Sequence, residues 1–345
     1  MTFQETQLNL HSQNSYSQTE GTSAIEINMQ TVSKYVRTPQ STDNKYSRGV
    51  LGLITGSNSY PGAAVLSTKA AAYCNIGMVR YAGPLRAQNL VLQSLPEAVV
   101  SEKLQGKINA LTIGSGISDS EHSYDEETKS QRKYIEEILK KYESEENNIQ
   151  SETQKSLPPV CVDAGALDLL PKNVCQKVIL TPHAGELSYL FKRYDSCISS
   201  QQIISNPIYY AQKAADLTGA TVLLKGAKTI VASPKNLNKP VYVAQYGPSW
   251  LATAGSGDVL SGIIGATLAQ QEETIENYAI IAASAAVIHG ISAMLAAYSS
   301  SENNYTQFVK ELVKAKKPLM LEHPIVASDI IAALPHVFGI LINMK

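Results

Sequence analysis

The stretch from Leu251 to Gln270, LATAGSGDVLSGIIGATLAQ, does most to decide the fold. A turn of small residues, Ala252 to Gly257, opens into a run of Gly, Ala, Ser and apolar residues that has no charge after Asp258. Backbone amides converge at such a turn, and the N-terminus of a helix favours negative charge. The pattern therefore predicts an anion-binding turn, Gly255 to Gly257, at the start of a helix whose face is built from small residues.

Short apolar runs alternate with helical patterns from Arg48 onward. Two clear helical patterns are Gly62–Cys74 and Tyr124–Tyr142. Such alternation implies crossover units and an α/β fold with a central, mostly parallel sheet and helices on both faces. The runs predicted as strands are Gly49–Thr55, Met78–Tyr81, Ala110–Ile113, Val160–Val162, Val178–Leu180, Thr221–Leu224, Thr229–Ala232 and, as an added and partly exposed strand, Val241–Gln245.

Two regions are expected along the chain. Residues 1–47 form a polar N-terminal extension that is expected to be partly disordered, between Asn9 and Thr22, with a short core-packed helix between Ile25 and Val36. Residues 48–345 show no boundary and are predicted to form one domain.

Composition narrows the class of protein. The chain has 345 residues, 44% of them hydrophobic, and a formal net charge of −1, which gives no electrostatic reason to expect nucleic acid or a membrane surface as a partner. Its four cysteines form no C-x-x-C pair and fit buried thiols in a reducing cytoplasm. Tyr278–Tyr298 has the length of a membrane span, but its alanine content favours a buried core helix. We therefore expect a soluble cytoplasmic protein.

Asp258 is the strongest candidate for chemistry. It lies at the predicted start of the helix, where a carboxylate can accept a proton from a substrate hydroxyl while the turn holds a phosphoryl group. A residue that only caps the helix is the alternative. The small-residue pattern on both sides of Asp258 favours the catalytic role.

Other candidates follow predicted strands, and ligands of open α/β sheets bind beyond the carboxyl ends of strands. In Leu224–Thr229, LKGAKT, Lys225 could offset phosphate charge, although a plain hairpin fits equally well. In Leu180–Leu187, LTPHAGEL, His183 could donate a hydrogen bond to a ligand, while a structural histidine is the favoured alternative.

Three more loops end strands of the predicted sheet. Thr55–Ala63 could line a substrate or simply connect a strand to a helix. Gly114–Gly116 and Asp163–Leu167 each follow an apolar strand, and Asp163 is expected to cap a helix in preference to touching a ligand.

Together and in this order, these motifs resemble the carbohydrate-kinase-like NAD(P)H-hydrate dehydratase family of the ribokinase superfamily, over about Gly49 to Pro335. The most specific pieces are L-T-P-H-x-G-E and L-A-T-x-G-S-G-D-V-L-S-G, and Ala327–Pro335 resembles the C-terminal helix of that family. The resemblance implies a ribokinase-like fold and a hydro-lyase of metabolite repair. Such an enzyme restores the S-form of hydrated NADH or NADPH by phosphorylating its hydroxyl and eliminating phosphate. ADP is the expected donor, with release of AMP, and ATP is the alternative.

The resemblance also implies roles for particular residues. Asp258 would be the catalytic base and would contact the hydroxyl of the substrate. The Gly255–Gly257 amides would form the anion hole, and Mg²⁺ would bridge the phosphates, with ligands that the resemblance does not identify. A homotetramer is implied as well. Residues implied to line the hydrated nicotinamide nucleotide are Ala63, Gly116 and His183, and those implied to hold AMP are Lys225, Gly226, Ala227, Lys228, Thr229 and Gly257.

The chain departs from the family pattern at two positions. Ser115 stands where the family usually has proline, and Gly165 stands where it usually has a second aspartate. Two alternatives stay open: a ribokinase-like kinase of a small alcohol, which shares the fold and the base, and a nucleotide-binding module without catalysis, which the two departures permit. The P-H-x-G-E segment argues against the first, and Asp258 in an intact glycine turn argues against the second.

Overall fold

The computed structural model describes residues 24–121, 125–144, 156–272, 277–298, 308 and 323–345. These residues form one ten-stranded sheet in the order β1-β10-β9-β8-β7-β6-β5-β2-β3-β4, and β9 alone in it runs antiparallel to its neighbours. The predicted α/β architecture is thus confirmed. The strands are β1 (Ala24–Glu26), β2 (Val50–Ile54), β3 (Met78–Ala82), β4 (Val99–Ser101), β5 (Ala110–Ile113), β6 (Val160–Val162), β7 (Val178–Leu180), β8 (Thr221–Leu224), β9 (Thr229–Ala232) and β10 (Val241–Ala244).

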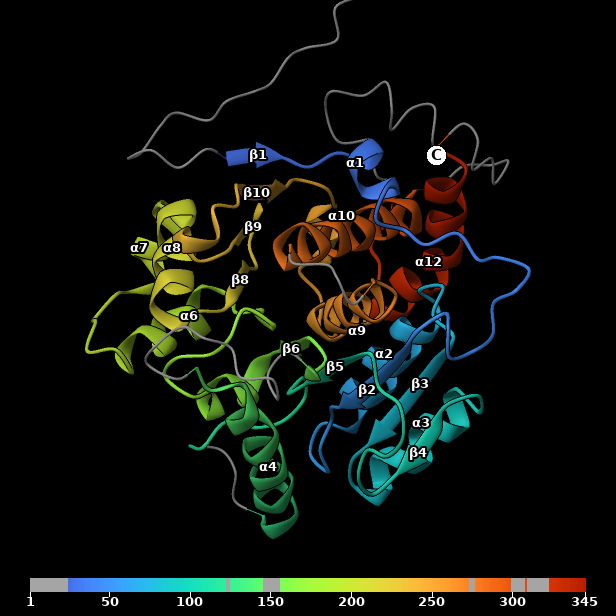
Figure 1. The fold of residues 1–345 in the computed structure, drawn as a ribbon, viewed down its shortest axis with the longest axis horizontal. Coiled ribbons are helices and arrows are strands. Elements are labelled where there is room, and N and C mark those ends of the chain that lie inside the picture. The colour runs from blue at the N-terminus through green and yellow to red at the C-terminus, as the bar shows by residue number, and fades with distance from the viewer. Residues whose placement is uncertain (1–23, 122–124, 145–155, 273–276, 299–307, 309–322) are drawn as a thin grey trace, which may run out of the picture.

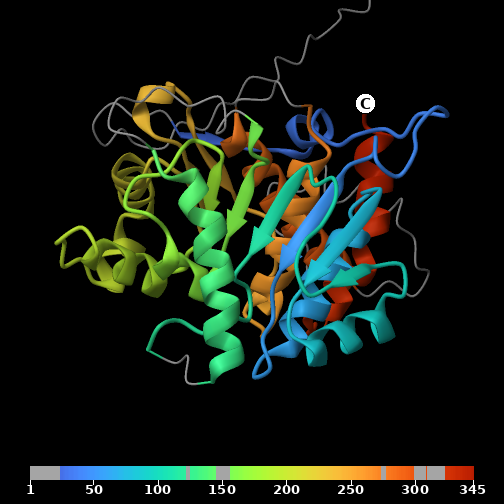
Figure 2. The ribbon, with the colours of Figure 1, turned by 60° about the horizontal axis from the view of Figure 1, so that its bottom comes forward.

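Helices cover both faces of the sheet (Figure 1). On one face α1 (Met29–Ser33), α2 (Pro61–Ala72), α3 (Leu85–Ser94), α9 (Ser256–Ala269), α10 (Tyr278–Ala297) and α12 (Ala327–Ile342) share a buried apolar cluster. On the other face lie α4 (Glu126–Leu139), η2 (Ala164–Leu169), α6 (Ala184–Lys192), α7 (Ser200–Ser205) and α8 (Pro207–Thr218). In Figure 2 the sheet separates α4, in green, from the orange and red helices behind it.

The strands alternate between these two clusters as the period of a β-strand requires. In β6, Val160 and Val162 belong to the cluster beside α4, and Cys161 between them belongs to the cluster beside α9. Since both sides are covered, most strands inside the sheet are short and mainly apolar runs. This is why the strands predicted from such runs are found at or within one residue of their predicted positions.

The expected exposure of one strand was wrong, and the prediction for the segment before residue 37 was incomplete. Val241–Gln245 was predicted to be partly exposed, yet every residue of β10 is buried. The reason is β1, which pairs in parallel with β10 and so takes the edge position. The predicted helix between Ile25 and Val36 is α1, preceded by this strand, and it buries Met29 and Val32. The predicted disorder of 9–22 lies outside the described residues.

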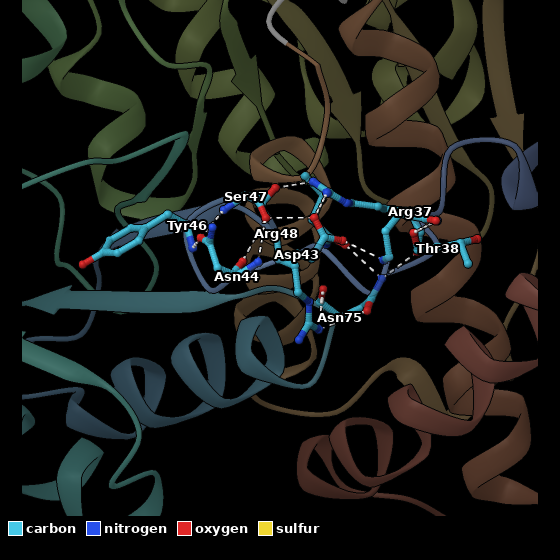
Figure 3. Close-up of polar contacts among 10 residues, drawn as sticks. Arg37, Thr38, Asp43, Asn44, Tyr46, Ser47, Arg48 and Asn75 are labelled. Atoms are coloured by element: carbon cyan, nitrogen blue, oxygen red, sulfur yellow. Dashed lines mark hydrogen bonds and ion pairs between the residues drawn. The ribbon is translucent and has the colours of Figure 1, made fainter.

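A polar network ties the segment after α1 to the rest of the fold (Figure 3). Arg37 pairs with Asp43 and donates to the backbone of Ser47, whose hydroxyl donates to Asp43 at 2.8 Å. Asn75, beyond the end of α2, donates at 2.8 Å to the carbonyl oxygen of Arg37 and at 3.2 Å to Oε1 of Gln270. Residues 37–48 are therefore held against the C-terminal end of α9.

The small residues of α9 bring this helix unusually close to its neighbours. A Cβ atom at Gly262 would lie 2.3 Å from the backbone oxygen of Ser67 in α2, and one at Gly265 would lie 2.0 Å from Oγ1 of Thr112 in β5. The predicted small-residue face is thus the packing surface of α9. Next to it lies α10, which among the described residues is the one helix long and apolar enough to span a membrane. Of its most apolar 18-residue window, 94% is buried inside the structure, as expected of a core helix.

We predict that Gly265→Ala destabilises the fold by about 1–3 kcal/mol, because the added methyl group must displace Thr112 or shift the helix. Chemical denaturation monitored by circular dichroism measures this free energy. Gly339→Ala is the matched control, since a Cβ there meets no atom within 4 Å and alanine favours the helical conformation by about 1 kcal/mol. Equal stabilities of the two variants would contradict the packing argument.

Candidate active site

The candidate site begins at the N-terminus of α9. Gly255 precedes the helix with φ +84°, a left-handed conformation, and a side chain there would meet Leu66 of α2 at 2.4 Å. Gly255 is at the N-cap position and has no side chain to accept hydrogen bonds from the amides of the first turn. Asp258 lies in this first turn. The glycine turn is thus at the start of α9, where the sequence predicted it.

Asp163, directly after β6, is the centre of a buried polar network. Its side chain does not cap η2, so the predicted capping role was wrong. Instead Oδ1 accepts hydrogen bonds from Lys225 Nζ at 2.8 Å and Thr181 Oγ1 at 2.8 Å. Oδ2 accepts from Ser115 Oγ at 2.9 Å and Ser261 Oγ at 2.7 Å. Burial acts to raise the pKa of Asp163, but Lys225 and the hydroxyl donors hold it below its ordinary value.

Lys225 extends from the end of β8 into this network. Its ammonium also lies 3.6 Å from Oε2 of Glu186, and a Cβ at Gly257 would lie 3.8 Å from it. Burial acts to lower the pKa of Lys225, but the charges of Asp163 and Glu186 raise it above its ordinary value. A permanent positive charge is therefore held beside the glycine turn of α9.

The pKa of Asp258 is raised, which favours the neutral form of its carboxyl group. Burial raises its pKa to about 7, the charge of Asp163 adds to this, and Lys225 opposes it. A pKa near the working pH lets one carboxyl group take up and release a proton with little cost in either direction. Asp258 thus has the proton affinity expected of a general base.

Two residues that the resemblance assigns to the substrate touch each other. Gly116, with φ +70°, approaches Ala63 so closely that a Cβ at Gly116 would lie 2.2 Å from that of Ala63. The loop after β2 is joined to the same place, because Gly56 donates its amide at 2.7 Å to the carbonyl oxygen of Ser115. The loops after β2 and β5 therefore meet next to the Asp163 network.

His183 caps α6 and still has a donor to offer. Its Nδ1 accepts from the amides of Gly185 at 3.0 Å and Glu186 at 3.2 Å, so the ring proton of the neutral tautomer is on Nε2. The side chain is 59% exposed, and His183 forms a parallel bridge with Lys225. The structural alternative is correct for Nδ1, and Nε2 lies 3.7 Å from Oε2 of Glu186.

The loop from Lys225 to Thr229 joins β8 to the antiparallel β9. Gly226, Ala227 and Lys228 in it are exposed, while Lys225 and Thr229 are half-buried. The hairpin alternative is therefore correct as a description of the backbone. The same hairpin presents Lys225 to the anion turn and leaves its tip accessible.

The structure also explains both departures from the family pattern. Ser115 is fully buried and its hydroxyl is one of the four donors to Asp163. Gly165 is pressed against the loop after β5, and a Cβ there would lie 2.2 Å from the carbonyl oxygen of Ile117. Arg132 of α4 holds this arrangement by donating to the carbonyl oxygens of Ser118 and Gly165. No side chain fits at Gly165 without a backbone shift.

Several residues of the site were missed by sequence reasoning. Thr181 and Ser261 were inside recognised motifs, but nothing in their types marked them as partners of Asp163. His289 of α10 lies 3.4 Å, Nε2 to Oγ, from Ser256 of the anion turn. Burial lowers the pKa of His289 to about 4, so the ring is neutral at pH 7. The signal for it was a lone imidazole in a helix that has no Asp, Glu, Lys or Arg.

Comparison with known proteins places this site in a family. A model of the NAD(P)H-hydrate dehydratase family matches residues 51–316. The bifunctional NAD(P)H-hydrate repair enzyme of Corynebacterium glutamicum is 35% identical over 285 residues, which are 75% of this chain and 45% of that protein. The ADP-dependent (S)-NAD(P)H-hydrate dehydratase of Neisseria meningitidis is 32% identical over 265 residues, 72% of this chain and 78% of that protein. The chain thus spans less than half the length of the bifunctional relative.

Solved structures share the fold. The ADP/ATP-dependent NAD(P)H-hydrate dehydratase of Bacillus subtilis, co-crystallised with ATP and Mg²⁺, matches with a TM-score of 0.67 at 22% identity, over 91% of this chain and 97% of that one. A ribokinase-like superfamily protein of Enterococcus faecalis also matches with a TM-score of 0.67, at 20% identity, over 92% and 96% of the two chains. The fold is therefore ribokinase-like, as predicted.

We predict that Asp163→Asn lowers the pKa of Asp258, because it removes the negative charge that raises this pKa. Titration of the carbon-13 carboxyl signals of labelled aspartate measures the shift. In the wild type the Asp258 signal is expected to titrate near pH 7. Asp168→Asn breaks a comparable ion pair with Arg132 and is expected to leave that signal unchanged. A raised pKa in Asp163→Asn would contradict the assigned electrostatics.

Proposed function

Because this chain belongs to the NAD(P)H-hydrate dehydratase family, we propose that it restores the S-form of hydrated NADH or NADPH by nucleotide-dependent dehydration. ADP is the proposed donor, and AMP and phosphate are the proposed products. The observation that supports this most directly is the placement of Asp258, with its pKa near 7, in the first turn of α9 beside Lys225. The proposed role is the repair of a damaged cofactor.

The proposed reaction starts from a poor leaving group. Hydroxide leaves a carbon atom with difficulty, whereas phosphate leaves easily. Asp258 takes the proton of the substrate hydroxyl while that oxygen bonds to the β-phosphorus of ADP and the bond to AMP breaks. The carbon–oxygen bond then breaks, phosphate departs, and loss of a ring proton restores the double bond. Asp258 must be a carboxylate before the first step, which a pKa of about 7 permits near neutrality.

The anion turn would stabilise the phosphoryl group in transit. Amides of Gly255, Ser256 and Gly257 at the start of α9 would donate to its oxygens, and the dipole of the helix favours their charge. The neutral imidazole of His289 lies beside Ser256 in this turn and adds no positive charge to it. Lys225 would neutralise part of the phosphate charge.

The two nucleotides would meet at this turn. We assign the hydrated nicotinamide to Ala63 and Gly116, whose close contact forms one wall, with His183 Nε2 as a hydrogen-bond donor. We assign the AMP part of the donor to Gly257 and the loop Lys225–Thr229, whose tip is exposed. Both assignments follow the family resemblance and are compatible with the contacts around Lys225.

Magnesium fits this site as a companion of the phosphates. Among the described residues no three His, Cys, Asp or Glu side chains gather as a metal cage. Mg²⁺ needs no such cage, because it binds through one or two carboxylates together with substrate phosphates. Asp258, in the first turn of α9, is the carboxylate that we propose as its neighbour. Bound Mg²⁺ would neutralise phosphate charge in the transfer.

Cell location, assembly and domain limits complete the proposal. The buried core helix α10 supports a soluble protein, and we propose the cytoplasm, where damaged NADH and NADPH arise. A homotetramer is proposed from the family resemblance. The catalytic domain is proposed to span residues 48–345, with β1 of the preceding segment added to its sheet.

The test is absorbance at about 340 nm, where reduced nicotinamide absorbs and its hydrate does not, after mixing the protein with hydrated NADH, Mg²⁺ and either ADP or ATP. A nucleotide-dependent rise is expected, and the faster nucleotide identifies the donor. A folded protein that binds ADP but gives no rise would exclude the dehydratase and leave the kinase of a small alcohol or the non-catalytic binder.

We predict that Asp258→Asn lowers the rate of this reaction by about 10²–10⁴-fold, the usual contribution of a positioned general base. The amide has the same shape and cannot take the proton. ADP affinity, measured by calorimetry, is expected to remain within a few-fold of wild type. A near-normal rate in this variant would remove Asp258 from the mechanism.

A further inference from the structure

The carboxylate of Asp163 has no acceptor position left for a ligand. It is only 3% exposed, and an ionised carboxylate offers about four lone-pair sites to donors. One ammonium and three hydroxyl groups occupy them at 2.7–2.9 Å. This saturation excludes Asp163 as a metal ligand and as a base in the proposed reaction. Asp163 must therefore act through the groups that donate hydrogen bonds to it.

One of these donors reaches the anion turn. The single hydroxyl proton of Ser261 has two acceptors within range, Asp163 Oδ2 at 2.7 Å and the carbonyl oxygen of Gly257 at 3.0 Å. The shorter contact goes to the charged acceptor, and hydrogen bonds to charged groups are the stronger ones. Asp163 is thereby joined to the first turn of α9 through Ser261.

The strongest donor reaches the same turn from the other side. Lys225 is held between Asp163 at 2.8 Å and Glu186 at 3.6 Å, and its ammonium lies beside Gly257. A long lysine side chain has many conformations in the absence of such a pair. The two fixed carboxylates hold the ammonium group of Lys225 in one position, next to the turn whose amides would bind a phosphoryl group.

We propose that Asp163 is a positioning residue of this site, which holds the ammonium group of Lys225 at the Gly255–Gly257 turn and is itself locked by the hydroxyl groups of Ser115, Thr181 and Ser261. The inference rests on the proposed function in one respect, namely that Lys225 contacts the phosphates of the donor nucleotide. Ser115 is the part specific to this chain, because proline at this position has no hydroxyl group to donate.

A double-mutant cycle tests whether Asp163 acts through Lys225. Asp163→Asn and Lys225→Met are made singly and together, and ADP affinity in the presence of Mg²⁺ is measured by calorimetry. Each single variant is expected to lose about tenfold or more in affinity, because a charged contact with phosphate is lost or misplaced. The double variant is expected to bind ADP no more weakly than Lys225→Met does. It also removes both charges of the pair, so neither is left without its partner.

Losses that multiply in the double variant would overturn the proposal, since Asp163 would then act independently of Lys225. Asp168→Asn, which breaks the half-buried pair with Arg132, is the matched control for general destabilisation. It is expected to lower the unfolding midpoint and leave ADP affinity unchanged. An equal loss of ADP affinity in Asp168→Asn would also overturn the proposal.

Ser115→Ala supplies a graded version of the same test. It removes one of four donors, so a two- to fivefold loss of ADP affinity is expected in the wild-type background and none in the Lys225→Met background.

The results distinguish a failure of the positioning role from a failure of the proposed function. A non-additive cycle in a protein without dehydratase activity would remove only the function. An additive cycle in an active dehydratase would remove only the positioning role, and a protein that binds no nucleotide would remove both.

Discussion

The ion pair between the buried carboxylate of Asp163 and the half-buried side chain of Lys225 is the interaction on which the rest of the site depends. A buried charge is tolerated only when it is paired and its remaining lone pairs are satisfied. The partners of Asp163 come from four different elements, so the carboxyl ends of neighbouring strands must be in register before the pair can form. The contributing positions are the loop after β5, the end of β7, the end of β8 and the second turn of α9.

The same pair sets the proton affinity of the candidate base. Asp258 is surrounded by protein, which favours its neutral form, and the charge of Asp163 acts in the same direction. Lys225 alone opposes them. A base for phosphoryl transfer must be ionised when substrate arrives and must still attract a proton from a hydroxyl group. Burial and the charge of Asp163 raise the pKa and the charge of Lys225 lowers it, so that it is near 7. At this pKa the carboxyl group can be ionised near neutral pH and can still take a proton from a hydroxyl group.

The fold could be predicted from the sequence because a sheet covered on both faces produces short apolar runs, and these mark the strands individually. β1 and β4 were missed because they are the two edge strands, are not fully buried, and so leave no continuous apolar run in the sequence. The exposure of β10 was mistaken because it depends on β1. For the site, sequence motifs indicated Asp258 and the glycine turn. The role of Asp163 could not be predicted, because its partners are ordinary hydroxyl groups that only the folded sheet brings together.

The departure at Ser115 shows how a change in a motif can be compensated locally. Read along the sequence, Ser115 and Gly165 looked like losses from the family pattern. In the fold Ser115 adds a donor to Asp163, and Gly165 lets the loop after β5 approach η2. Both effects depend on close packing, and so does the role of Ser261, which reaches Asp163 only because Gly262 and Gly265 let α9 lie against α2 and β5. The small-residue face of α9 is therefore part of the chemistry, since it brings the helix N-terminus to the edge of the sheet where the charges are held.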